Sequence, residues 1–364
     1  MLAHNGAEKL TIETRHGRFT LMRPRLHDQK GREVHLPCPT VSEALRSRAL
    51  FWVNRLSYGD VARLLEQMSG LPLLSEDGIW RLVQKEAQGL DAAQRQAIEE
   101  AADLTEPEYV AAAELYTPEG AEFVVMTDGI GVKAQKPTRE KAGQPKKAKV
   151  EKRHDTDVLI VPRRDGGEQL LCEGVSGGWT LVEAARSFLK REWSGALLPV
   201  IALTDGAKTI RADLSDLFGE GVRIVLDWYH LQKRVYQQLS MAAHSMKERG
   251  EWESPVLSFL WRGKVKEAKA FLLGLAPRSS KALSDLVGYL DKHAEEIIDY
   301  ERRQAAGKVI GSGRMEKCVD QVVGHRQKGK GMSWTRAGSR ALALLRVAEL
   351  NARSLIAAPQ TLPA

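Results

Sequence analysis

Two short apolar runs that each end in Thr-Asp-Gly constrain this chain most. Asp128 closes the run Phe-Val-Val-Met-Thr-Asp-Gly at 123–129, and Asp205 closes Val-Ile-Ala-Leu-Thr-Asp-Gly at 200–206. Such runs, rich in β-branched residues, predict buried strands with a carboxylate at the carboxyl end, where glycine lets the backbone turn away. Open α/β sheets carry their chemistry at strand ends of this kind. The chain is therefore expected to fold around a sheet that presents two aspartates.

Strand and helix patterns alternate from residue 122 to residue 230. The expected strands are 122–134, which carries Asp128, then 156–163, 168–175, 198–204 and 222–227, and the expected helices are 181–193 and 208–218. The second and third strands are joined by Asp165-Gly-Gly167, which is a hairpin signal. This order, with acids on the first and fourth strands, is that of a ribonuclease-H-like fold with a mixed five-stranded sheet.

The strand rhythm stops after the last of these strands. Residues 231–309 contain helical patterns and no convincing strand, which predicts an all-helical insertion. From residue 310 the chain resumes with Gly311-Ser-Gly313 and a helical pattern that carries Glu316. The insertion is therefore expected to leave the sheet after Asp227 and to return just before Glu316.

The N-terminal region mixes one hairpin with helices. Residues 17–38 predict a β-hairpin with its turn at 28–31, and residues 41–103 have helical periodicity. Within them, one short helix stops at Gly70 and the next begins with Ser75 as its N-cap. This pair fits either a helix-turn-helix, with the second helix reading DNA, or a plain αα-hairpin.

The second helix of that pair offers two cations to DNA. Arg81 and Lys85 lie four residues apart and so share one helical face. Glu76 and Asp77 at the start of the helix repel phosphates, which weakens the DNA-binding interpretation.

Composition narrows the class of protein. The chain has 364 residues and a formal charge of +7, a moderate excess that only hints at a polyanionic partner. Its three cysteines, Cys38, Cys172 and Cys318, are far apart, so neither a disulfide framework nor a cysteine zinc ribbon is expected. No apolar stretch approaches a membrane span or a signal-peptide core. The expectation is a cytoplasmic protein that does not bind membranes.

Several motifs of the second half occur in one order. They are Thr127-Asp-Gly129, Thr204-Asp-Gly-Ala207, Asp227-Trp-Tyr-His230, Gly311-Ser-Gly-Arg-Met-Glu316, His325-Arg-Gln-Lys-Gly-Lys-Gly-Met-Ser-Trp334, and Leu344-Leu-Arg346 with Asn351. On these residues, over roughly 120–353, the chain resembles DDE transposases of bacterial insertion sequences, in the branch related to eukaryotic Mutator-like transposases. The resemblance implies a ribonuclease-H-like core, an Asp-Asp-Glu triad that binds two divalent metal ions, and a helical insertion before the glutamate.

Asp128, Asp205 and Glu316 are therefore the expected catalytic and metal-binding residues. Spacings of 77 and then 111 residues leave room for the insertion. Mg²⁺ prefers oxygen ligands, and two such ions, with Mn²⁺ as a substitute, suit phosphodiester cleavage and strand transfer. Asp227 competes for the second position, but Asp205 is preferred because the first and fourth strands are neighbours in this fold. Asp320, one helical turn after Glu316, is a weaker substitute for it.

Each of these acids also has an ordinary structural interpretation. An Asp-Gly pair after a strand is often only a turn, and Glu316 in a first helical turn can simply complement the helix dipole. It is the repetition of Thr-Asp-Gly together with the Glu316 motif that favours metal ligands.

Further DNA contacts are expected from His230 and from the basic segment that follows Glu316. In that segment Arg326, Lys328 and Lys330 can neutralise phosphates and Trp334 can stack on a base. A hydrogen-bonded histidine at a strand end and a solvated basic loop are the alternatives. The basic stretch 136–153 is expected at a hairpin tip near DNA.

Related N-terminal regions often carry a zinc-binding cysteine cluster. This chain has only Cys38 there, so no structural zinc is expected.

Together these patterns predict a DNA transposase that cuts insertion-sequence ends and joins them to target DNA. The expected domains are a DNA-binding region at 1–104, a first catalytic part at 105–230, the helical insertion at 231–309 and a second catalytic part at 310–364. The expected partners are double-stranded DNA, as terminal inverted repeats and target, and further copies of the chain, at least as a dimer. The expected location is the cytoplasm of a bacterium, at the nucleoid.

Two other functions remain open at this point. A junction-resolvase-type nuclease would share the acids but would need neither a helix-turn-helix nor a large insertion. An inactivated, host-adopted DNA-binding protein would not need an intact triad.

Overall fold

The computed structural model describes residues 3–27, 30, 33–34, 40–111, 114–136, 152–175 and 177–357. The chain forms two compact units, each assembled from separate stretches of sequence. The first unit contains Met1–Ala92, Val132–His154 and Val322–Arg346, and the second contains Ala93–Gly131, Asp155–Gln321 and Val347–Ala364. The predicted domain boundaries at residues 104, 230 and 309 stay a prediction. Cys38 and most of the basic stretch 136–153 lie outside the described residues.

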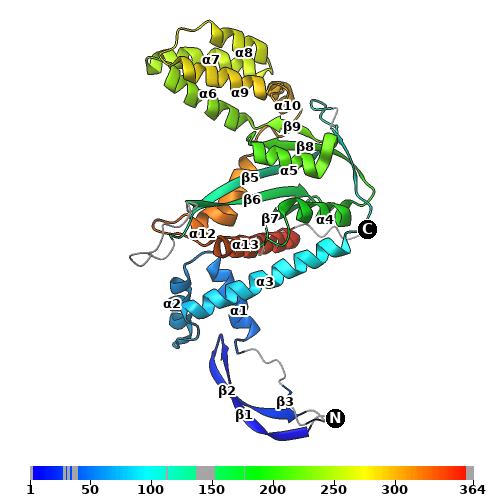
Figure 1. The fold of residues 1–364 in the computed structure, drawn as a ribbon, viewed down its shortest axis with the longest axis vertical. Coiled ribbons are helices and arrows are strands. Elements are labelled where there is room, and N and C mark those ends of the chain that lie inside the picture. Colours follow the sequence, from blue (N-terminus) through cyan, green and yellow to red (C-terminus); the bar gives the residue numbers. More distant parts are fainter. Residues whose placement is uncertain are drawn as a thin grey trace, which may run out of the picture. The chain divides into compact units, whose positions relative to one another are not determined.

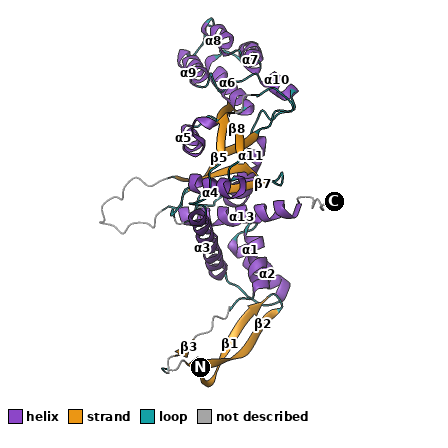
Figure 2. Cartoon of the chain, turned by 90° about the vertical axis from the view of Figure 1, so that its right-hand side faces the viewer, coloured by secondary structure: helices purple, strands orange, loops and turns teal. Residues whose placement is uncertain are grey.

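The first unit begins with a long antiparallel hairpin (Figure 2). Strand β1 (Ala3–Thr14) pairs with β2 (Gly17–His27), and the short β3 (Glu33–Val34) pairs with the end of β2. The predicted hairpin at 17–38 covers β2 and β3, whereas β1 was missed because its polar sequence carries little strand signal. Most of the predicted turn at 28–31 lies outside the described residues.

Three helices follow the hairpin in the sequence, and the last of them runs past Ala92 into the second unit. They are α1 (Glu43–Val53), α2 (Tyr58–Ser69) and α3 (Glu76–Glu100). Gly70 ends α2 in the left-handed conformation, with φ at 73°, and the hydroxyl of Ser75 accepts the Gly78 N–H at 3.1 Å, so both predicted helix boundaries are confirmed. The choice between a helix-turn-helix and a plain helical hairpin stays open.

The central sheet has six strands (Figure 1). They are β4 (Glu108–Ala111), β5 (Phe123–Lys133), β6 (Arg153–Pro162), β7 (Glu168–Cys172), β8 (Leu197–Thr204) and β9 (Arg223–Leu226). Strands β5, β4 and β9 run parallel to β8, and β7 runs antiparallel to β6. The predicted mixed sheet is therefore confirmed, including the adjacency of the first and fourth expected strands, β5 and β8.

The sheet differs from the prediction by one strand. Strand β4 pairs with the first half of β8, and β9 pairs with its second half, so both occupy the same side of β8. The prediction of five strands was wrong because β4 has only four residues, Glu-Tyr-Val-Ala, which are too few to show a period.

Two helices cover one face of the sheet. The helices α4 (Leu181–Trp193) and α5 (Lys208–Phe218) pack Leu189 and Leu214 against Val125, Val161 and Ala202 of the strands. Their bounds match the predicted helices. For α4 the reason is local, since Thr180 and Glu183 form a reciprocal capping box at its start.

The segment between β9 and Glu316 is helical. It contains α6 (Trp228–Ala242), α7 (Met246–Trp261), α8 (Val265–Leu273), α9 (Ser280–Lys292) and α10 (Tyr300–Ala305). Helix α6 packs against α7 and α9, and α8 packs against the same two helices. Within 177–357, all of which is described, this segment contributes no strand.

The remaining helices begin with the one that carries Glu316. They are α11 (Gly313–Val319), α12 (His325–Gln327) and α13 (Arg336–Ala357), with a π-helical turn at Asp320–Gly324 before α12. None of the helices in the described ranges is both long and apolar enough to cross a bilayer.

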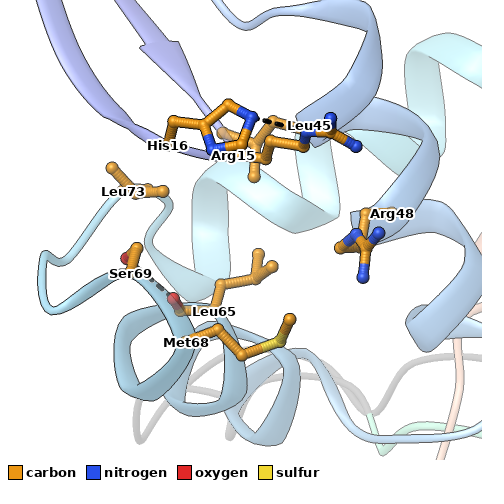
Figure 3. Close-up of a pocket in the computed structure, with 8 residues that line it drawn as sticks. All are labelled: Arg15, His16, Leu45, Arg48, Leu65, Met68, Ser69 and Leu73. Atoms are coloured by element: carbon orange, nitrogen blue, oxygen red, sulfur yellow. Dashed lines mark hydrogen bonds between the residues drawn. The ribbon is translucent and has the colours of Figure 1, made fainter.

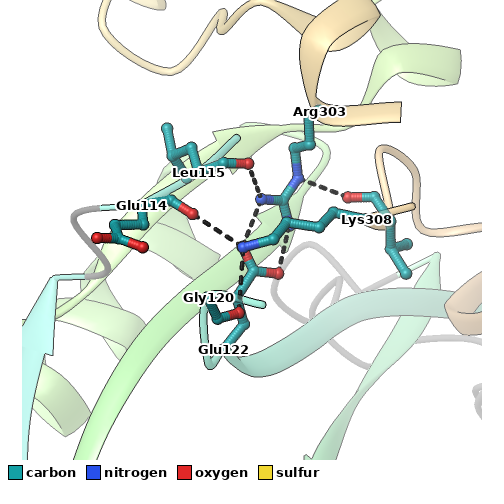
Figure 4. A network of polar contacts seen from close by, with 7 residues as sticks. Glu114, Leu115, Gly120, Glu122, Arg303 and Lys308 are labelled. Atoms are coloured by element: carbon teal, nitrogen blue, oxygen red, sulfur yellow. Dashed lines mark hydrogen bonds and ion pairs between the residues drawn. The ribbon is translucent and has the colours of Figure 1, made fainter. Parts of the chain in front are cut away.

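A buried ionic network links the end of the helical segment to the beginning of β5 (Figure 4). The guanidinium of Arg303, on α10, donates to both oxygens of Glu122 at 2.6 and 2.9 Å, and Lys308 reaches the same carboxylate at 3.1 Å. Arg303 also donates to the carbonyls of Leu115 and Val309. All three charged side chains are less than a tenth exposed, so each depends on the others for its charge compensation.

Replacing Glu122 should therefore destabilise the fold strongly. Glu122→Gln leaves two buried cations unpaired, which is expected to lower the free energy of unfolding by about 3–5 kcal/mol. The exposed pair Arg262–Glu301 supplies the control, because Glu301→Gln is expected to cost less than about 1 kcal/mol. Urea denaturation at neutral pH measures both. Equal, small effects would show that the network does not hold this part of the fold.

Candidate functional site

Asp128 lies within strand β5, which continues beyond it to Lys133. The interpretation that Gly129 turns the chain at this point was wrong. Pairing with β8 stops at Met126, however, so Asp128 lies just beyond the part of the strand that pairs with β8. Gly129 has another role, since a Cβ there would meet the carboxylate of Asp157 on the neighbouring strand β6 and displace it.

Asp205 follows the end of β8, where the predicted glycine turn is confirmed. Gly206 has a φ of 82°, its N–H donates to the Thr204 hydroxyl at 3.0 Å, and the Asp205 carboxylate accepts the N–H of Ala207 at 2.8 Å. Gly206 also packs against the buried ring of His293, where a Cβ would lie 2.5 Å from Cε1. His293, which follows α9, therefore packs against the turn that presents Asp205.

Glu316 lies in the first turn of α11. Its N–H donates to the carbonyl of Ser312 at 3.0 Å, and its side chain is 59% exposed. The acid therefore projects from a helix start whose backbone is held by the Gly-Ser-Gly motif.

Asp227 connects that motif to the end of β9. Its carboxylate is buried, accepts the His230 N–H at 2.7 Å and also accepts the Ser312 N–H. Both of its oxygens accept backbone N–H groups. Burial would raise the pKa of Asp227, but the side chain of His230 and the N–H groups of Ser312 and His230 hold that pKa below its usual range.

His230 lies between two of these acids. Its Nδ1 is 3.3 Å from Oδ1 of Asp227, poorly aligned for a hydrogen bond, and its Nε2 is 3.8 Å from Oε1 of Glu316. The side-chain contact with Asp227 raises the pKa of His230 above its usual range, against the opposing effect of burial. A protonated His230 would direct positive charge at Glu316.

Two of the predicted acids act electrostatically on the third, Asp128. Burial raises the pKa of Asp128, and the negative charges of Asp205 and Glu316 raise it further. Like charges that repel at short range bind cations readily, because a cation removes the repulsion.

The donor set suits Mg²⁺ chemically, since Asp128, Asp205 and Glu316 offer only oxygen ligands. Among the described residues, however, no group of three or more His, Cys, Asp or Glu side chains is arranged closely enough to hold a metal ion. The structure thus brings the acids into one neighbourhood without forming a coordination sphere.

Two residues of this neighbourhood were missed in the sequence. Asp157 faces Gly129, and burial together with Glu173 and other acids raises its pKa to about 6. Tyr229 is 57% exposed, and its ring packs against Gly311, where a Cβ would lie 2.5 Å from the ring. The Asp-Thr-Asp at the start of a predicted strand was the only local signal for Asp157, and Tyr229 had none beyond its motif.

The predicted DNA-binding residues after Glu316 divide into two groups. Lys328 and Lys330 are exposed. Arg326, in contrast, is 5% exposed, donates to the carbonyl of Val53 at 2.8 Å and stacks on the rings of Tyr58 and Trp334. Because its guanidinium is enclosed by protein, Arg326 supports the fold, and the expected phosphate contact is corrected to this structural role.

Trp334 has a structural contact of its own. Its indole N–H donates to the carbonyl of Gln327 at 2.9 Å, and its backbone forms a bridge to Ala134. Trp334 is partly exposed, and its stacking on a base stays a prediction.

The two cations on α3 are both exposed. Arg81 forms an ion pair with Asp77 at 2.7 Å, so one of the acids that weakened the DNA-binding interpretation neutralises the arginine directly.

Comparison with known proteins gives likenesses to solved structures only. Neither a protein-family model nor a curated protein matches the sequence. The chain is similar to a structure described as the Drosophila P element transposase strand transfer complex, at 8% identity and a TM-score of 0.28, over 90% of this chain and 82% of that one. It is also similar to a pre-cleavage Mos1 transpososome, at 12% identity and a TM-score of 0.18, over 80% and 82% of the two chains. At these TM-scores the likenesses carry no argument.

The raised pKa of Asp157 predicts a stabilising substitution. The protonated form is favoured in the folded state, so the contribution of this group to stability is present below its ordinary pKa of 3.8 and is lost as pH rises through about 6. Without divalent metal, Asp157→Asn should therefore be more stable than the wild type at pH 7.5 by roughly 1 kcal/mol, with the difference vanishing near pH 4.

Urea denaturation in EDTA across this pH range measures the difference. Asp285→Asn is the control, since Asp285 is exposed on α9 and should show no such pH dependence. A difference for Asp157→Asn that is constant with pH would contradict the charge repulsion.

The contact between His230 and Asp227 predicts a shift that NMR can follow. The Asp227→Asn variant lacks the carboxylate that raises the pKa of His230, so that pKa should fall towards or below its ordinary value of 6.5. Titration of the ring ¹³C–¹H signals in both proteins measures it. An unchanged pKa would show that Asp227 does not interact with the imidazole.

Proposed function

We propose that this chain is a metal-dependent DNA transposase that cleaves the ends of an insertion sequence and joins them to target DNA. The observation that carries the proposal is the placement of acids from separate parts of the sequence. Asp128 on β5 and Asp205 after β8 belong to neighbouring strands, and Oε1 of Glu316 on α11 lies 3.8 Å from Nε2 of His230. The charges of Asp205 and Glu316 both act on Asp128. Such a concentration of oxygen ligands beside a mixed sheet fits phosphodiester chemistry.

The proposed metal ligands are Asp128, Asp205 and Glu316, with Mg²⁺ or Mn²⁺ as the ion. When bound, two such ions activate the attacking oxygen and stabilise the leaving oxygen. His230, whose pKa is raised and whose Nε2 lies 3.8 Å from Glu316, is proposed to bind a phosphate oxygen of the DNA. The engaged oxygens of Asp227 support Asp205 as the second ligand.

Lys328 and Lys330, both exposed, are proposed to bind the backbone of double-stranded DNA. Arg81 and Lys85 remain proposed contacts of the N-terminal region, and Arg81 would exchange Asp77 for a phosphate. Because two element ends must be joined in one event, the proposal includes a homo-oligomer, at least a dimer. The branch related to Mutator-like transposases and a bacterial, nucleoid-associated location belong to the same proposal.

The test is cleavage of a DNA fragment that carries the sequences flanking the coding region. With Mg²⁺ or Mn²⁺, the wild type should release the element ends, and EDTA should abolish the reaction. Asp128→Asn, Asp205→Asn and Glu316→Gln should each lower the rate by at least about 1000-fold, which corresponds to about 4 kcal/mol of lost transition-state stabilisation, while DNA binding persists.

Asp320→Asn is the matched control, since Asp320 lies one turn beyond Glu316 and should leave the rate within a few-fold of the wild type. An active Asp205→Asn with an inactive Asp227→Asn would move the second ligand to Asp227. Cleaved products that never become joined to a target plasmid would identify a nuclease in place of a transposase.

A further inference from the structure

A cavity of about 250 Å³ lies in the first unit, beside the turn that joins β1 and β2 (Figure 3). Side chains of this turn, of α1, of α2 and of the segment before α3 enclose it. The lining residues are Arg15, His16, Leu45, Arg48, Leu65, Met68, Ser69 and Leu73. The cavity belongs wholly to this unit and is separate from the acids around Asp128.

The floor of the cavity is apolar. Leu45, Leu65 and Leu73 are each at most 5% exposed, and Met68 is 56% exposed. A surface of this kind accepts the carbon-rich face of a ligand without leaving polar atoms unpaired.

The polar residues of the cavity are mainly cationic. Arg15 and Arg48 both line it, and no carboxylate does so in the part of the chain that the structure describes. Arg15 donates from Nε to Nε2 of the neighbouring His16 at 2.9 Å, and this contact leaves its terminal amino groups available. Nε2 of His16 can accept this hydrogen bond only when the imidazole is neutral, so the positive charge at the cavity comes from the two arginines.

Neighbouring arginines of the same unit differ in this respect. Four of them form an ion pair with a carboxylate. These pairs are Arg18–Glu13, Arg23–Glu8, Arg46–Glu43 and Arg63–Asp60. No such partner is present for Arg15 or Arg48 among the described residues. Two uncompensated arginines at one apolar cavity are an arrangement that an anionic ligand would complete.

We propose that this cavity binds one nucleotide unit of DNA, with its backbone phosphate between Arg15 and Arg48 and its deoxyribose over the leucine floor. A volume of about 250 Å³ is below the roughly 300 Å³ at which pockets for drug-sized ligands begin, which suits a phosphate and its deoxyribose while the base stays in the duplex. Guanidinium groups match phosphate oxygens in geometry as well as charge. The proposal rests on the proposed function, because it gives the N-terminal region a DNA contact.

The test measures how salt affects DNA binding by the full chain in EDTA, where cleavage cannot occur. The probe is a labelled duplex taken from the DNA that flanks the coding region, and fluorescence anisotropy gives Kd at several salt concentrations. Each phosphate contact contributes about 0.9 to the slope of log K against log salt. Arg15→Ala with Arg48→Ala should therefore reduce the slope by about 0.9 and weaken binding several-fold at low salt.

Arg63→Ala is the matched control. Arg63 is an exposed arginine of the same unit that is already paired with Asp60, so its loss should leave the slope unchanged. Arg15→Lys with Arg48→Lys keeps the charge and should restore most of the slope. A thermal melt of each variant checks the fold, and Met68→Glu, which adds a carboxylate at the cavity, should weaken binding without removing either arginine.

An unchanged slope in the double alanine variant, with the wild type binding normally, would overturn the cavity proposal and leave the proposed function intact. A wild type that fails to bind the duplex at any salt concentration would overturn the proposed function, and the cavity proposal with it. Loss of polyglutamate binding in the double variant, with DNA binding retained, would assign the cavity to an acidic peptide and overturn the proposal.

Discussion

The buried carboxylate of Asp227 is the interaction on which the site depends. It ends β9, caps α6 through the His230 N–H and accepts the Ser312 N–H from the start of α11. A buried charge is tolerated only when its lone pairs are filled, so the chain before the helical segment and the chain after it are obliged to meet at this residue. That meeting places Glu316 beside His230.

The helical segment is joined to the sheet by further buried polar contacts. His293 and Glu296 are within hydrogen-bond reach of each other at 2.7 Å, and Arg211 of α5 contacts both. Because the His293 ring fills the space against Gly206, this cluster supports the turn that follows Asp205. The Glu122 network acts at the start of β5 in the same way. The helices after α6 are thus part of the framework that shapes the acidic site. Removing any one partner of these contacts would leave a buried charge unpaired.

Two groups of described residues hold charges that a ligand could balance. Burial raises the pKa of Asp128, nearby acids raise it further, and a cation would relieve their repulsion. In the first unit, most arginines near the hairpin are neutralised by a glutamate or aspartate, while Arg15 and Arg48 are not. Paired charges mainly hold the fold, whereas unpaired ones remain able to bind a ligand.

The sequence by itself determined the elements whose signal is local. Strand β8 and helix α4 were predicted closely because a β-branched run and a capping box act within a few residues, and the position of Asp205 after β8 came with them. Strands β1 and β4 were not, since a polar or very short strand is stabilised by its partner and has no strong preference of its own. Only the tertiary structure decided which side chains meet. It brought Asp157 to Gly129, and it buried Arg326 against the carbonyl of Val53. A basic loop has the same sequence pattern whether it is exposed to solvent or enclosed by protein. Burial depends on residues distant in the chain, and no local pattern encodes it.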